Sequence, residues 1–213
     1  MMPKGRPPFI DEAKAGLRRV LQDRHIGVDD EPAPRGDRRY YFTSHNATTV
    51  FLGETKYRGM PVRLNPPRPF LCSVDVLVGY RNKVWQLRDA SIVVFYAPGE
   101  SAEPFPLVRA EWSSDQESNA RHAQPHWHVY PWPQAPSTIP IGMQRSRRVG
   151  ALELERCHWA MCGQFQLSPG GHHVALATAD IARWIEQCLV YSLGQLAYVS
   201  DKSPRAGPFG PPG

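Results

Sequence analysis

Three histidines lie close together in one short stretch of the chain. His122, His126 and His128 are three of the eight histidines in the sequence, and all fall within seven residues. Neutral imidazole nitrogens are ligands that zinc and other transition metals bind well. The stretch therefore predicts a divalent transition-metal site, for zinc or a similar ion, with these three histidines as ligands. Glu111 or His158 could add a further ligand.

The same stretch has the pattern of a β-strand. Residues 124–130 alternate polar and apolar side chains, and a proline lies near each end, at 125 and 131. On such a strand the polar side chains share one face and the apolar ones the other: His126, His128 and Tyr130 against Trp127 and Val129. Residues two apart on a strand lie about 6–7 Å apart at their Cα atoms, so two imidazoles can reach one metal ion or one phosphate.

Two further stretches, 105–112 and 152–161, alternate in the same way. If these strands are neighbours of the histidine strand, their apolar side chains form one face and their polar side chains the other. The polar face then carries Arg109, Glu111, His126, His128, Tyr130, Arg156 and His158. An ordinary solvated sheet face is the plainer interpretation. A functional site is favoured by the choice of histidine, arginine and tyrosine, which bind metals, phosphates and bases.

Several chemistries remain open for this face. In a metal-dependent hydrolase, Glu111 could act as a base on bound water, with His128 in a catalytic role. A phosphate or nucleic-acid site would use donors on the same strands, namely Arg109, Arg156, His158 and Tyr130. Metal-free cleavage of a phosphodiester could use the two strand histidines as base and acid.

The stretch Gln124–Tyr130 also resembles the histidine-triad signature of nucleotide hydrolases and transferases, in which histidine alternates with apolar residues three times. In this chain Tyr130 stands where the third histidine of that signature would be. The resemblance implies nucleotide hydrolysis or transfer, with His128 at the position of the nucleophile.

The elements that must position these residues indicate an α+β fold. Apolar residues at helical spacing predict an amphipathic helix over 9–25, ending near Gly27, and a long C-terminal helix over 178–199. Short β-like runs fill the space between, over 40–44, 48–52, 70–80, 83–89, 92–97, 105–112, 125–130 and 152–161. With no helical pattern between them, they predict an antiparallel sheet, a meander or partly closed barrel, flanked by the two helices.

The connections are also readable from composition. Residues 79–83 predict a hairpin turn, and 29–39, rich in Asp, Pro and Arg, a mobile loop. Asp75 and Asp89 fall in strand-like runs, where a buried pair could bind metal, although salt bridges with Arg81 or Arg88 are the simpler expectation. We expect one domain over 1–199 and a flexible Pro/Gly-rich tail over 200–213.

Composition narrows the class of protein. The net charge of +5 weakly favours a polyanionic partner. No apolar run is long enough to span a membrane, which predicts a cytoplasmic protein, and Cys72, Cys157, Cys162 and Cys188 are expected to be reduced and mostly buried. The bias toward Arg, Ala and Pro is typical of a GC-rich bacterial genome. No P-loop, GxGxxG or GxSxG motif is present, which argues against NTPase, Rossmann and α/β-hydrolase chemistry.

Two functions follow as hypotheses, and the sequence does not decide whether the protein is an enzyme. The first is a metal-dependent hydrolase or nuclease-like protein that acts on a phosphate-containing substrate, with nucleic acid as one class of ligand. The second is a non-catalytic subunit of a bacterial assembly, of the defence or toxin-antitoxin type, that docks a protein partner. The Trp- and Pro-rich loop Trp127–Pro140 would anchor that partner.

Overall fold

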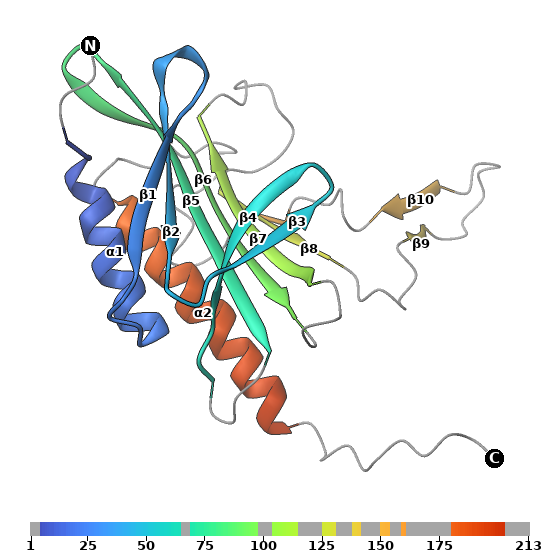
Figure 1. Ribbon diagram of the computed structural model, residues 1–213. Helices are drawn as coiled ribbons and strands as arrows, with labels where there is room; N and C mark the ends of the chain where they lie inside the picture. Colours follow the sequence, from blue (N-terminus) through green and yellow to red (C-terminus); the bar gives the residue numbers. More distant parts are fainter. Residues whose placement is uncertain are drawn as a thin grey trace, which may run out of the picture.

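The computed structural model describes residues 5–64, 69–97, 104–114, 125–130, 138–141, 150–153, 159–160 and 180–202. Within these residues the protein has the predicted α+β fold, an antiparallel sheet with an N-terminal and a C-terminal helix packed together. Figure 1 shows both helices on one side of the sheet and a long β-hairpin across its other side.

The main sheet has nine strands among the described residues. Seven follow one another in the antiparallel order β1-β2-β5-β6-β7-β8-β11. The strands are β1 (Gly27–Pro32), β2 (Arg38–Thr43), β3 (Thr48–Leu52), β4 (Thr55–Pro61), β5 (Phe70–Arg81), β6 (Val84–Tyr96), β7 (Phe105–Ser113), β8 (His126–Val129) and β11 (Trp159–Ala160). A separate pair consists of β9 (Thr138–Ile141) and β10 (Gly150–Glu153).

The longest hairpin joins β5 to β6, and its turn lies within the predicted residues 79–83. Two residues connect the strands, Asn82 at φ 52° and Lys83 at φ 62°. Positive φ at both central positions matches the twist of the flanking strands. The two runs predicted over 83–89 and 92–97 form the single strand β6.

Several segments differ from the sequence prediction. The predicted run 152–161 is not one strand beside the histidine strand: Gly150–Glu153 form β10, which pairs with β9, and Trp159–Ala160 form β11, which pairs with β8. Residues 29–39 are not a loop: β1 extends to Pro32, the 3-10 turn η1 (Pro34–Gly36) follows, and β2 starts at Arg38. The charged residues of β1 are not typical of a strand, so this edge strand was not predicted. In the structure they form ion pairs with other strands: Asp30 lies 2.6 Å from Arg38 of β2, and Asp29 lies 2.5 Å from Arg58 of β4. Strand β4 was also missed. It returns from β3 and pairs with β5 at Met60 and Pro61.

The two helices lie against each other behind the sheet. Helix α1 (Pro8–Leu21) ends earlier than predicted, because Gln22 takes the left-handed conformation. The backbone N–H of Gln22 donates a hydrogen bond to the carbonyl oxygen of Arg18. Gly27 is the first residue of β1 and not the helix stop. Helix α2 (Ile181–Lys202) ion-pairs with α1 through Glu186 and Arg19, 2.8 Å apart.

The core fills the space between helices and sheet. The predicted apolar stripe of α2 is buried there, including Trp184, Ile185 and Leu189. It meets the predicted apolar face of β7, where Ala110 and Trp112 are buried. Each buried aliphatic side chain of this kind stabilises the fold by about 1.5–3 kcal/mol. The predicted apolar faces of α2 and β7 are therefore confirmed, whereas Cys157 and Met161 of the third predicted strand lie outside the described residues.

The opposite face of the sheet is covered in part by the β3–β4 hairpin. Val50 and Tyr57 from the hairpin pack on Val93 and Phe95 of β6, forming a second small apolar cluster. This cluster holds the hairpin against the sheet. Beside it, the same face becomes polar.

Cysteine and membrane predictions can be checked only in part. Cys72 and Cys188 are free and buried, as predicted, and burial raises the pKa of the Cys72 thiol to about 12. Cys157 and Cys162 lie outside the described residues. Neither helix in the described part of the chain is long and apolar enough to cross a membrane.

Candidate metal site and adjoining pocket

Strand register brings the polar residues into one row across the sheet. Paired positions in an antiparallel sheet present their side chains to the same face. Reading across β2, β5, β6, β7 and β8, the paired residues are Tyr41, Asp75, Ser91, Glu111 and His126. The next row pairs Arg109 with His128. Four of the predicted site residues, from two strands, thus share a face.

Three of these side chains converge at one point. The Nε2 atoms of His126 and His128 are 2.9 Å apart, and Nε2 of His128 is 2.9 Å from Oε2 of Glu111. Nε2 of His126 lies 3.5 Å from the same oxygen. Both imidazoles are buried, with relative exposures of 0% and 4%. Glu111, His126 and His128 therefore form a compact group that could hold a metal ion.

The separations match the edges of a coordination polyhedron. Metal–ligand bonds of about 2.1 Å place neighbouring ligand atoms about 3.0 Å apart in octahedral and about 3.4 Å apart in tetrahedral geometry. The three observed separations run from 2.9 to 3.5 Å. Two histidines and one carboxylate are also the ligands of known catalytic zinc sites and of iron facial triads.

Hydrogen bonds without a metal ion explain these three contacts less well than metal coordination does. Nε2 of His128 is in contact with both a nitrogen and a carboxylate oxygen, each at 2.9 Å. A neutral imidazole has at most one proton on this atom, so a linear hydrogen bond can be made to only one of the two. A cation between the three atoms would instead use a lone pair from each.

Glu111 also bonds the neighbouring arginine. The Arg109 Nη2 atom lies 3.0 Å from Glu111 Oε2. Burial alone would raise the pKa of this carboxyl, but hydrogen bonds from His126 and His128 and the charge of Arg109 hold the pKa well below its usual range. The lowered pKa favours the carboxylate form of Glu111, which is the form a metal ligand requires.

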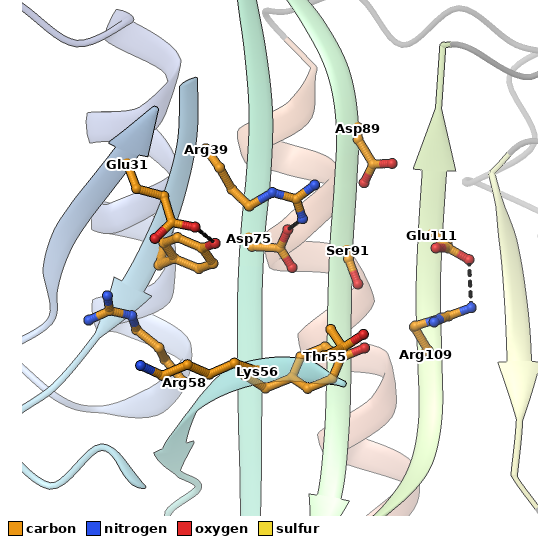
Figure 2. Close-up of a pocket in the computed structure, with 12 residues that line it drawn as sticks. Glu31, Arg39, Thr55, Lys56, Arg58, Asp75, Asp89, Ser91, Arg109 and Glu111 are labelled. Atoms are coloured by element: carbon orange, nitrogen blue, oxygen red, sulfur yellow. Dashed lines mark hydrogen bonds and ion pairs between the residues drawn. The ribbon is translucent and has the colours of Figure 1, made fainter. Parts of the chain in front are cut away.

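The triad borders a pocket of about 550 Å³ on the hairpin side of the sheet. Figure 2 shows its walls, with charged side chains from adjacent strands pointing into the space above the sheet and the β4 residues closing one side. The lining residues are Glu31, Arg39, Tyr41, Thr55, Lys56, Tyr57, Arg58, Asp75, Asp89, Ser91, Arg109 and Glu111. Glu111 thus belongs both to the triad and to the pocket wall.

A second charged pair lies at the pocket floor. Arg39 Nη1 is 2.7 Å from Oδ1 of the buried Asp75 (Figure 2). Burial raises the pKa of Asp75 to about 6, although the charge of Arg39 opposes the rise. The predicted salt bridge of Asp75 with Arg81 or Arg88 is therefore wrong. Arg88 instead lies 3.9 Å from Asp37.

Asp89 is the other aspartate of the pocket. Burial, together with the nearby charges of Asp75 and Glu111, raises its pKa to about 7. Among the described residues, no cation lies within salt-bridge distance of its carboxylate. A carboxyl with this pKa exchanges protons near neutrality.

Because the pKa of Asp89 is raised on folding, this residue makes the stability of the protein depend on pH. An unfolded aspartate loses its proton near pH 3.8, whereas the folded one holds its proton to about pH 7. The folded state therefore binds more protons, and its stability falls as pH rises through this window. Asp89→Asn should raise the free energy of unfolding by up to about 4 kcal/mol at pH 8 and by only about 0.5 kcal/mol at pH 4.

Urea unfolding followed by circular dichroism at several pH values tests this. The matched control is Glu12→Gln on the exposed face of α1, which should leave the pH profile unchanged. A gain for Asp89→Asn that is equal at pH 4 and pH 8 would contradict the assignment.

The remaining predicted site residues have different outcomes. Tyr130 follows β8, and its N–H donates to Leu107. Its side chain is half-buried. Trp127 points to the other face, as predicted, packs on the core and lies 6.0 Å from the ring of Tyr191. His122, Arg156 and His158 lie outside the described residues.

Comparison with known proteins gives no family for this fold and site. No protein-family model matches the chain, and neither a curated protein nor a solved structure matches it.

Proposed function

We propose that this protein is a metal-dependent hydrolase that acts on a phosphate-containing substrate. The observation that carries the proposal is the convergence of Glu111, His126 and His128 at the edge of a polar pocket. In this role a bound divalent ion, zinc or a similar metal, would supply Lewis acidity. Glu111, His126 and His128 would supply three protein ligands, the number that catalytic metal sites commonly use, and Glu111 also lines the pocket.

The cationic side chains of the pocket would bind the phosphate. Arg109 lies beside Glu111, and Lys56 and Arg58 line one side of the pocket from β4 (Figure 2). Arginine pairs with phosphate oxygens through two parallel hydrogen bonds. Arg109 already donates to Glu111, so it would hold the substrate and the ligand carboxylate in a fixed relation.

Asp89 is the group that we assign to proton transfer. Glu111, which the sequence predicts as a base, fits that role less well because its Oε2 already faces both histidines. Asp89 lines the same pocket. Its carboxylate would accept the proton of the attacking water while the new P–O bond forms and the bond to the leaving oxygen breaks.

The test is hydrolysis of bis(4-nitrophenyl) phosphate by protein loaded with Zn²⁺ or Mn²⁺. We expect turnover that is lost after chelation and falls by about 100-fold or more in His128→Gln. His25→Gln, an exposed histidine elsewhere, is the matched control and should be as active as the wild type. Equal activity of chelated and loaded protein would contradict the proposal.

The docking hypothesis has less support from the described residues. Trp127, the first aromatic residue of the proposed docking loop, packs on the protein's own core. A partner site further along this loop, a nucleic-acid ligand and a role in bacterial defence stay predictions.

A further inference from the structure

A second pocket lies at the C-terminal end of α1 and has a different charge. It encloses about 570 Å³. Its lining residues are Arg18, Arg19, Gln22, Asp23, Arg24, His25 and Arg63. Four arginines and one aspartate give it a positive charge, whereas the pocket beside the triad has acidic and basic residues in equal number.

Two of the four arginines already bind groups within the protein, one through an ion pair and one through a hydrogen bond. Arg19 makes two contacts with the carboxylate of Glu186, at 2.8 and 3.3 Å. Arg18 donates to the carbonyl oxygen of Ile26 at 3.1 Å. These two also lie in the last turn of α1, where positive charge offsets the negative end of the helix dipole.

The other two arginines are not accounted for in this way. Arg24 lies beyond the helix end and donates to the ring of His25 at 3.2 Å, and Arg63 follows β4. Within the described part of the chain, neither has a carboxylate at salt-bridge distance. The nearby Asp23 carboxylate accepts the backbone N–H of His25 at 2.9 Å.

The pocket is assembled from separate parts of the chain. His25 stacks on His45, from the turn between β2 and β3, with ring centroids 4.4 Å apart. This contact ties the segment after α1 to the β2–β3 turn, while Arg63 comes from the segment between β4 and β5. Two arginines from distant segments, Arg24 and Arg63, therefore line one pocket.

We propose that this pocket binds phosphate groups of an anionic ligand, either a small phosphate compound or the backbone of a nucleic acid. Arg24 and Arg63 would each donate to phosphate oxygens, and His25 would add a third donor. The proposal needs no metal and does not depend on the hydrolase activity.

The experiment measures anion binding by the full chain in buffer with EDTA, so that the Glu111 site holds no metal. The probes are inorganic pyrophosphate, followed by calorimetry, and a fluorescein-labelled oligothymidylate, followed by polarisation. We expect Arg24→Glu/Arg63→Glu to lose about tenfold or more in affinity for the probe that binds. Arg81→Glu, an exposed arginine at the end of β5, is the matched control and should bind as the wild type does.

Each outcome has one meaning. Binding of pyrophosphate that the double variant loses supports a small phosphate ligand. Binding of the oligonucleotide alone, with the same loss, supports a nucleic acid. A melting curve checks folding, and Arg24→Lys/Arg63→Lys, which keeps both charges, should keep most of the binding. No binding of either probe, or equal binding by the double variant, overturns the proposal and leaves the metal site untouched.

Discussion

Replacing Arg39 by methionine should lower the free energy of unfolding by about 2–4 kcal/mol at pH 8. Arg39 is the ion-pair partner of Asp75, whose side chain is only 8% exposed. Removing the guanidinium leaves a buried carboxylate without its counter-charge, which costs more than the net contribution of the pair. Urea unfolding of the variant measures the loss.

Two further variants separate this effect from lost packing. Arg39→Met/Asp75→Asn removes both charges and should recover most of the stability. Arg81→Met changes an exposed arginine and should have almost no effect. Because Asp75 can take up a proton, with a pKa of about 6 even beside Arg39, the loss in Arg39→Met should shrink toward pH 4. A loss that is independent of pH and is not recovered in the double variant would show that the pair does not matter.

Zinc should raise the melting temperature of chelator-treated protein by several degrees. A ligand that binds only the folded state stabilises it by about 2.7 kcal/mol at 100 times its Kd and by about 4.1 kcal/mol at 1,000 times. For a chain of this length each kcal/mol corresponds to about 2–4 °C. The expected shift is therefore about 5–15 °C in a scanning calorimeter.

Variants of the triad assign this shift to the site. His128→Gln removes a ligand whose Nε2 touches both partners, so the zinc shift should vanish. Glu111→Gln keeps the side-chain shape but not the charge and should reduce the shift strongly. His25→Gln/His45→Gln, which changes the stacked pair outside the triad, should keep the full shift. A zinc shift of equal size in all four proteins would place the metal elsewhere.

Much of the fold could be read from the sequence because its elements have strong local patterns. The apolar stripe of α2 and the turn at residues 82–83 depend on helical spacing and turn chemistry, which are local properties. Strand β1 was missed because three of its six residues, Asp29, Asp30 and Glu31, are acidic and the strand ends in a proline. The strand is stabilised by pairing with β2, and such pairing cannot be seen in the residue pattern of one segment alone.

Only the part of the site on β7 and β8 could be predicted from the sequence. Alternation in two strands correctly placed Arg109, Glu111, His126 and His128 on one face, and register then brought three of them together. Arg39 was missed as a pocket residue because it lies in the segment 29–39 that was taken for a loop. Tyr41 lies in the predicted run 40–44, but the pairing of that run with β5, which brings Tyr41 to the pocket, cannot be read from either segment alone. The alternation of these two residues with buried Tyr40 and Phe42 was the available signal.

The central claim is that Glu111, His126 and His128 hold a metal ion, and its most direct test is the metal content of protein purified without a histidine tag. Elemental mass spectrometry should find about one Zn, Mn, Ni or Fe per chain in the wild type and almost none in His126→Ala/His128→Ala. His25→Ala/His45→Ala, with the same number of histidines removed, should keep the wild-type content. Metal-free wild type that also fails to take up added Zn²⁺, or equal metal in both double variants, would contradict the claim.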